Sequence, residues 1–240
     1  MKILAIDTSN YALGVALLNG NQVVGELITN LKKNHSVRAM PAIEQLMKDC
    51  EIKPSEIDKI VVAKGPGSYT GVRIGVTLAK TLAWTLNIPI SGISSLEVLA
   101  MNGRYFDGYI APLFDGRRGQ IFTGLYEWID NHLVRVKEDV IVQSRDFATD
   151  LLSLDRRVLF IGNDISIHKE TLESILGEKA IFADLTQSNP RPSELALLGR
   201  EAASENVHEF VPEYLRLAEA EANWIQQQKK MDVNETKDGM

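Results

Sequence analysis

The sequence has 240 residues, enough for one large domain or two lobes of ordinary size, and its 45% hydrophobic and 24% charged residues are typical of a folded protein. Its formal net charge is -6. A protein that binds nucleic acid by itself usually presents a basic face, because neutralising phosphates supplies much of the affinity. The charge therefore argues against independent nucleic-acid binding, and a partner is expected to hold any RNA that the function involves.

Cysteine content and the N-terminal sequence bear on the compartment. Cys50 is the single cysteine, which excludes an internal disulfide and favours a reducing environment. The N-terminal apolar run ends at Asp7, too soon for a signal-peptide core, and no stretch approaches transmembrane length. The sequence therefore predicts a cytoplasmic protein with no membrane contact.

The first third of the chain predicts a strand meander followed by a helix. Residues 3–6 form a short apolar run that ends in the polar turn Asp7-Thr8-Ser9. Two further runs, 13–18 and 22–27, flank Asn19-Gly20, a pair typical of two-residue hairpin turns. Apolar residues then recur at helical spacing over 35–50, where Pro41 marks either the first turn of the helix or a kink.

The chain then predicts a strand, a glycine-rich loop, a long helix and another strand. The strands cover 59–63 and 88–93, and the helix runs from about Gly71 to Leu86. Between the first strand and the helix lies the loop 64–71, which contains three glycines. This order places the loop directly before a helix N-terminus, where backbone N–H groups are free to bind an anion.

The second half repeats the first in outline. Its predicted strands are 109–114, 120–128, 133–142 and 158–161, and its predicted helices are 147–152, 165–176 and 192–203. We place a lobe boundary near 101–107, which gives a first lobe of residues 1–105 and a second of 106–217. Residues 218–240 are polar and are predicted to form a flexible tail.

Two segments are candidates for phosphate contact. The carboxylate and hydroxyls of 7–9 are suited to a metal-bound phosphate, but the same residues suit a simple Asx or ST turn. The 65–71 loop lacks the Gly-Lys-Ser/Thr ending of a P-loop, so it shows no transferase site. The two roles are compatible. The candidate contacts are Asp7, Thr8, Ser9, Gly65, Gly67 and Ser68.

The helix 71–86 carries only two charges, Arg73 and Lys80. Gly71, Gly75, Ala79 and Ala83 form a small-residue stripe that lets another helix approach closely. Either this is a fully buried core helix or its apolar surface docks a partner. On the docking hypothesis, a large charged residue at position 79 abolishes association and leaves the monomer folded; unfolding would show that the helix is core.

Common routes to catalysis are missing from the sequence. The four histidines are far apart, so no pair has the spacing of a zinc or iron site, and Cys50 has no neighbour to activate it. A Gly-x-Ser-x-Gly elbow is absent. These absences argue against a peptidase.

The segments 2–9, 35–36 and 65–75 together resemble the TsaB (YeaZ) family, specifically over residues 1–125 and more loosely to 212–216. TsaB proteins are similar to TsaD, the catalytic subunit of their pathway. The resemblance implies an α/β, actin/Hsp70-like (ASKHA) fold of two lobes, each a mixed β-sheet flanked by helices. It also implies a role in threonylcarbamoyladenosine (t6A) synthesis at position 37 of tRNAs reading ANN codons, together with TsaD, TsaE and TsaC.

The resemblance also implies partners and an interface. It implies a heterodimer with TsaD, a ternary complex with TsaE, a homodimer when alone, and only indirect contact with tRNA. The family dimerises through helices matched here near 36–50 and 71–86. The interface residues that follow are Met40, Ile43, Met47, Val72, Gly75, Val76, Ala79 and Ala83.

One departure from TsaD determines the expected role. TsaD carries a histidine pair after the strand that matches 88–93, and residues 94–101 contain no histidine. We therefore expect no metal and no catalysis here, no cofactor on the chain alone, and ATP or ADP only in the complex. Three alternatives remain: an actin-like small-molecule kinase or ATPase using Asp7 and the 65–71 loop, a peptidase, and a self-contained homodimeric module.

Overall fold

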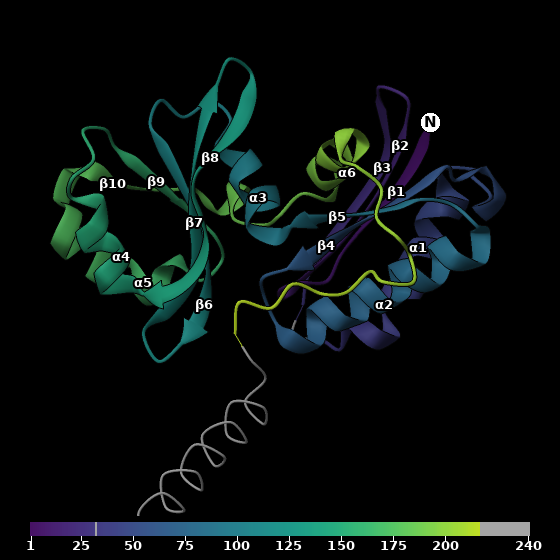
Figure 1. Ribbon diagram of the computed structural model, residues 1–240, viewed down its shortest axis with the longest axis horizontal. Helices are drawn as coiled ribbons and strands as arrows, with labels where there is room; N and C mark the ends of the chain where they lie inside the picture. The colour runs from purple at the N-terminus through teal and green to yellow at the C-terminus, as the bar shows by residue number, and fades with distance from the viewer. Residues whose placement is uncertain (32, 217–240) are drawn as a thin grey trace, which may run out of the picture.

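The computed structural model describes residues 1–31 and 33–216, which form two lobes side by side (Figure 1). The first lobe holds a five-stranded sheet in the order β3-β2-β1-β4-β5. The antiparallel pairing of β1 with β2 and of β2 with β3 confirms the predicted meander, and β4 and β5 add in parallel. The bounds are β1 Lys2–Asp7, β2 Ala12–Asn19, β3 Gln22–Asn30, β4 Lys59–Gly65 and β5 Ile90–Ser94.

The second lobe repeats this topology. Its sheet has the order β10-β9-β6-β7-β8, with an antiparallel meander of β6, β7 and β8 and with β9 and β10 added in parallel. The predicted resemblance between the two halves is therefore confirmed, and β10, which the sequence did not predict, completes the match. The bounds are β6 Tyr109–Arg117, β7 Gln120–Ile129, β8 His132–Gln143, β9 Val158–Ile161 and β10 Ala180–Phe182.

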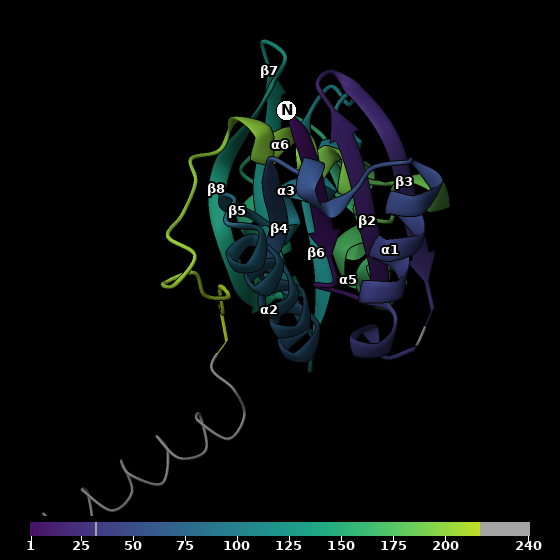
Figure 2. The same cartoon turned by 90° about the vertical axis from the view of Figure 1, so that its right-hand side faces the viewer.

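Helices cover both sheets. In the first lobe, α1 (Ala39–Asp49) and α2 (Tyr69–Leu86) lie side by side over one face, as Figure 2 shows. Pro41 lies in the first turn of α1 and therefore does not kink it. The other α-helices are α3 Ser95–Ala100, α4 Ser144–Leu151, α5 Ile165–Leu176 and α6 Pro192–Glu201, and short 3-10 turns cover His35–Val37, Pro54–Glu56, Met101–Gly103, Gly177–Lys179 and Leu185–Gln187.

The C-terminal part of the predicted second lobe packs on the first lobe, which corrects the expected 106–217 boundary. Helix α6 lies on the face of the first sheet opposite α1 and α2 (Figure 1). Gly199 of α6 faces Val61 of β4 so closely that an added Cβ would stand 2.1 Å from a valine methyl. Gly14 of β2 meets Pro192 in the same way, at 3.2 Å. Helix α6 thus belongs to the first lobe by its packing, although it follows the strands of the second lobe in the chain.

A polar network joins the lobes where α3 meets the second sheet. Both oxygens of Asp139 on β8 accept hydrogen bonds at 2.5 Å, one from Ser94 Oγ and one from the Tyr126 hydroxyl. Arg135 lies 3.9 Å from Asp139 and bonds Glu97 of α3 at 3.1 Å. Since Ser94 also caps α3, one aspartate fixes the end of the first lobe against the second. We call this group the Asp139 network.

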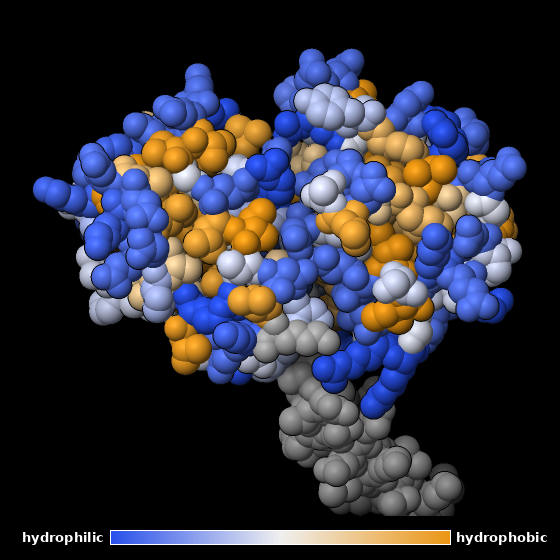
Figure 3. Space-filling model, turned by 180° about the vertical axis from the view of Figure 1, so that it is seen from behind, coloured by the Kyte–Doolittle hydropathy of each residue, from blue (hydrophilic) through white to orange (hydrophobic). Residues whose placement is uncertain are grey.

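The described residues contain no helix that is both long and apolar enough to cross a membrane. Seen from behind, the molecule has small apolar patches on both lobes, broken by charged residues, and a notch between the lobes at its upper edge (Figure 3). This face of the molecule is thus mixed in hydropathy rather than uniformly apolar.

Candidate functional site

The two predicted phosphate-contact segments come together between β1 and α2. The turn after β1 places Thr8 against the first turn of α2, where its hydroxyl donates to the Gly71 carbonyl at 2.7 Å. The Ser68 N–H donates to the Ser9 carbonyl at 2.7 Å. The sequence-predicted residues of both segments therefore form one contiguous layer in the structure.

Glycines make this contact possible. A Cβ added to Gly67 would stand 2.2 Å from the Ser9 carbonyl oxygen, and one added to Gly71 would stand 2.2 Å from that of Thr8. At Gly75 an added Cβ would stand 2.5 Å from the Thr8 hydroxyl oxygen. The small-residue stripe of α2 thus receives the turn after β1, because only glycine lets the backbone approach so closely.

Several of the groups that would hold a phosphate already have partners within the chain. Ser68 Oγ accepts from the Gly71 N–H at 3.3 Å, while the Ser9 N–H and hydroxyl both donate to Asp7 Oδ1. The Glu213 carbonyl lies 2.4 Å from an ideal Cβ position on Gly65, so a C-terminal segment covers the loop. In this conformation the layer is a packed turn, and nucleotide contact here stays a prediction.

Asp7 is a buried acid in this layer, with only 2% of its surface exposed. Desolvation by burial raises the pKa of Asp7, although the hydrogen bonds from Ser9 and the neighbouring His35 oppose the shift. Its second oxygen, Oδ2, is buried without a hydrogen-bond partner. His35 is held nearby by a hydrogen bond from its Nε2 to the Asn10 carbonyl at 2.7 Å.

Asp7→Asn is expected to stabilise the fold at neutral pH by about 1 kcal/mol, within the range of single stabilising changes. Because the pKa is raised, the folded chain binds the carboxyl proton more tightly than the unfolded chain. The contribution of Asp7 to the free energy of unfolding is therefore greatest below the unfolded pKa and falls as pH rises towards the folded pKa. Urea denaturation over a pH series tests this: the variant's advantage should grow with pH, and the exposed-site control Asp155→Asn should show no such trend. A constant difference at all pH values would contradict the argument.

The predicted partner interface is largely buried inside the chain, which corrects that prediction. Seven of its eight residues are buried: six belong to the core of the first lobe, because α1 and α2 turn these side chains towards their own sheet, and the seventh is Gly75. Ala79 is 0% exposed. Met40 is the exception, at 44% exposed. The seven buried residues are Ile43, Met47, Val72, Gly75, Val76, Ala79 and Ala83.

The opposite face of α2 is open, and together with the start of α1 it forms a groove of about 530 Å³. Met40 from α1 and Tyr69 from the first turn of α2 stand at this groove, and each is more than two-fifths exposed. Arg73 stacks over the Tyr69 ring at 5.3 Å. We call this hollow the α1–α2 groove; it is lined by Ser36, Ala39, Met40, Tyr69, Thr70, Arg73, Ile74, Thr77, Leu78 and Thr81.

Sequence reasoning missed most of these groove residues, although a signal for them exists. Arg73, Thr77 and Thr81 recur every four residues on α2, so they mark one polar stripe along the helix. The small residues also recur every four positions, but they lie on another side of the helix, which faces the sheet. The exposed face of α2 is therefore located by the positions of its polar residues and not by the positions of its small residues.

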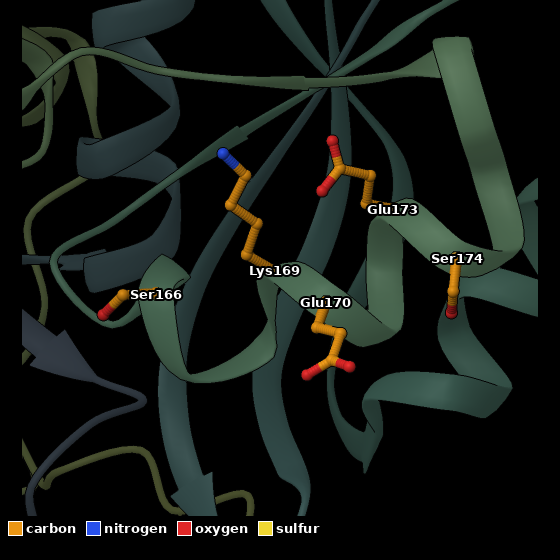
Figure 4. A pocket seen from close by; sticks show the side chains of 5 residues that line it. All are labelled: Ser166, Lys169, Glu170, Glu173 and Ser174. Atoms are coloured by element: carbon orange, nitrogen blue, oxygen red, sulfur yellow. The ribbon is translucent and has the colours of Figure 1, made fainter.

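A second hollow, of about 490 Å³, lies on the outer surface of α5. Figure 4 shows that Lys169 and Glu173 point to one side of the helix and that Glu170 and Ser174 point to the other. These side chains do not converge on a common point, so the hollow presents no reactive constellation. Among residues 1–31 and 33–216, no group of three or more histidine, cysteine, aspartate or glutamate residues could hold a metal ion.

Comparison with known proteins identifies the family. Residues 22–224 match the family model described as TsaD: tRNA N6-adenosine threonylcarbamoyltransferase. The tRNA threonylcarbamoyladenosine biosynthesis protein TsaB of Bacillus subtilis (strain 168) is 61% identical over 229 residues, which are 95% of this chain and all of that protein. The chain belongs to the TsaB family. The Escherichia coli (strain K12) protein of the same name is 32% identical over 133 residues, 55% of this chain and 57% of that protein.

Solved structures confirm the predicted actin/Hsp70-like fold. YeaZ from Pseudomonas aeruginosa has a TM-score of 0.74 at 22% identity and covers 89% of this chain and 99% of its own. The ROK hexokinase of Thermus thermophilus reaches a TM-score of 0.50 at 10% identity, covering 83% of this chain and 98% of its own. The two-lobe fold is therefore shared well beyond TsaB proteins, and function has to be argued from the surface of this chain.

Proposed function

We propose that this TsaB-family chain is a non-catalytic subunit in t6A synthesis on tRNA and that it acts by binding TsaD through the α1–α2 groove. The observation that carries the proposal is the open face of α2. The exposed ring of Tyr69 and the half-buried side chains of Ile74 and Leu78 line a concave surface next to Met40. Surfaces of this kind are typical of helix-mediated protein association.

The same groove accounts for the alternative partners. A groove between two helices accepts a helix from any chain of matching shape, so a second copy of this chain occupies it when TsaD is absent. The net charge of -6 supports a role in which other subunits bind the tRNA. TsaE joins the complex of this chain with TsaD. This proposal needs no nucleotide on the isolated chain, where the backbone N–H of Ser68 and both donors of Ser9 are bonded internally; ATP or ADP enters only with the complex.

Thr77→Arg is expected to weaken TsaD binding by about 100-fold or more, because a large charged side chain at the groove has to be desolvated against the partner. Thr77 is exposed, so the folded chain should keep its thermal stability. Isothermal titration calorimetry with purified TsaD measures the affinity. Thr149→Arg on the exposed surface of α4 provides the matched control and should bind as the unchanged chain does.

Reconstitution tests the role itself. Purified TsaD, TsaE and TsaC are incubated with tRNA, threonine, bicarbonate and ATP, with and without this chain, and t6A is measured in digested tRNA. We expect t6A only when the chain is present and much less with Thr77→Arg. Full t6A synthesis without the chain would refute the subunit role, and ATP hydrolysis by the isolated chain would instead favour the kinase or ATPase alternative.

A further inference from the structure

Residues 205–216 form a non-helical segment, with one turn at 207–209, that is bonded along the first lobe; we call it the strap. Its start is anchored by an ion pair of 3.5 Å between Lys64 and Glu205. Lys80 of α2 then donates to the carbonyls of His208 and Phe210 at 2.8 and 3.1 Å. The Phe210 side chain is buried in the core of the first lobe. In Figure 1 the strap is the yellow-green segment that runs across α2 towards the second lobe.

The end of the strap is bonded to the second lobe. Leu215 packs against the core cluster that α3 forms with β6 and β7. The Arg216 guanidinium donates to the Gly116 carbonyl at 2.9 Å and also to Gln120 Oε1. Both acceptors lie at the tip of the β6–β7 hairpin. A single segment therefore ties the first lobe to one hairpin of the second.

Between these two anchors the strap touches the α1–α2 groove. The rings of Tyr214 and Tyr69 lie 4.9 Å apart, and Arg73 stacks on the Tyr69 ring at 5.3 Å. Tyr69 and Arg73 line the groove, whereas Tyr214 belongs to the strap. Tyr69 is 43% exposed at the groove, so a molecule seated there contacts the Tyr69 ring, whereas Tyr214, 42% exposed, does not line the groove and reaches it only through this stack.

We propose that the strap couples occupation of the α1–α2 groove to the β6–β7 hairpin of the second lobe. The proposal rests on the function proposed above, in which TsaD occupies the groove. A partner packed on Tyr69 and Arg73 confines the ring of Tyr214, and Leu215 and Arg216 follow directly in the chain. Confining Tyr214 therefore holds Arg216 on its two hairpin acceptors, and the hairpin becomes more rigid when the groove is filled.

Hydrogen exchange of the full chain, alone and saturated with TsaD, tests the coupling. In the unchanged chain, TsaD should slow amide exchange in peptides that cover 113–122 by about fivefold or more. Tyr214→Ala should lose this slowing while its affinity for TsaD stays within about threefold. Tyr214→Phe keeps the ring and should keep the slowing, as should Tyr105→Ala, which truncates a tyrosine 95% exposed elsewhere.

A second variant tests the hairpin anchor without any partner. Arg216→Ala should speed exchange at 113–122 in the free chain by about fivefold, whereas Arg145→Ala, at an exposed arginine of α4, should not. Unchanged exchange in Arg216→Ala would overturn the proposal. So would slowing that persists in Tyr214→Ala, slowing that is absent from the unchanged chain bound to TsaD, or loss of TsaD binding in Tyr214→Ala.

The two proposals fail in different ways. If Thr77→Arg binds TsaD normally, the groove is not the docking surface and the proposed function fails. If Thr77→Arg abolishes binding but TsaD leaves the hairpin exchange unchanged, the docking surface stands and only the coupling through the strap is refuted.

Discussion

Replacing Ala79 with arginine is expected to unfold much of the chain, rather than only to block a partner. Ala79 is 0% exposed and lies between α2 and the first sheet, in the main core cluster of the first lobe. An arginine there either carries an unpaired charge into the core or forces α2 off the sheet. Buried unpaired charges cost about 3–5 kcal/mol, which is a large part of the stability of a typical domain.

Urea denaturation followed by circular dichroism measures this effect. We expect the unfolding midpoint of Ala79→Arg to fall steeply, while Thr77→Arg, two residues earlier on the exposed face of the same helix, stays close to the unchanged chain. The pair separates the two sides of α2 with the same introduced side chain. A folded Ala79→Arg that has lost only its partner would restore the small-residue stripe as the docking surface.

The sequence singled out α2, but the α2 residues that it assigned to a partner interface are buried inside the first lobe, as the core-helix alternative expects. A stripe of glycine and alanine indicates close approach by some neighbour, and it does not say which one. Here the neighbours are the chain's own sheet and the turn at Thr8 and Ser9, which press on Gly67, Gly71 and Gly75. That contact joins segments far apart in the chain, so no local pattern reveals it.

Local signals predicted the meanders well. A two-residue turn joins β2 and β3 as expected, but it consists of Gly20 and Asn21, because Asn19 is the last residue of β2 and pairs with Gln22; Gly20 has a φ of +59°. The turn between β7 and β8 uses Asp130 and Asn131, both at positive φ, another pair that tolerates this backbone region. Turn chemistry and strand alternation were sufficient for these elements because each depends on residues within a few positions of the turn.

The return of α6 to the first lobe could not be predicted in the same way. The apolar pattern of 192–203 predicts a helix, and the helix is found over Pro192–Glu201. Its location depends on Gly199 fitting over Val61 and on Gly14 fitting under Pro192. These are contacts between the two ends of the chain, and sequence order alone placed the helix in the second lobe.

The sequence predicted which residues form the candidate phosphate site, but it did not predict that several of their hydrogen-bonding groups are occupied within the chain. The sequence brought together the turn after β1 and the loop before α2, and the structure packs them against each other. It did not show that both donors of Ser9 and the backbone N–H of Ser68 already have acceptors within the chain. The predicted tail, 218–240, lies outside the described residues.

The Asp139 network supplies the other large expected effect, because one side chain serves both lobes. Asp139 accepts from Ser94 of the first lobe and from Tyr126 of the second, and its side chain is 5% exposed. Burial, the charge of Asp139 and the hydrogen bond to it raise the pKa of Tyr126, so the phenol stays protonated as a donor. Removing the carboxylate leaves the hydroxyls of Ser94 and Tyr126 without their acceptor. It also removes one of the negative charges close to Arg135.

Asp139→Ala is therefore expected to lower the free energy of unfolding by about 2–4 kcal/mol, since each buried donor left without an acceptor costs about 1–3 kcal/mol. Asp139→Asn keeps one acceptor oxygen and should lose less. Urea denaturation of Asp139→Ala, Ser94→Ala and the double variant gives the coupling between the two residues. Because Ser94 is the point at which the first lobe enters the network, a coupling energy near zero would show that Asp139 acts within the second lobe alone and does not join the lobes.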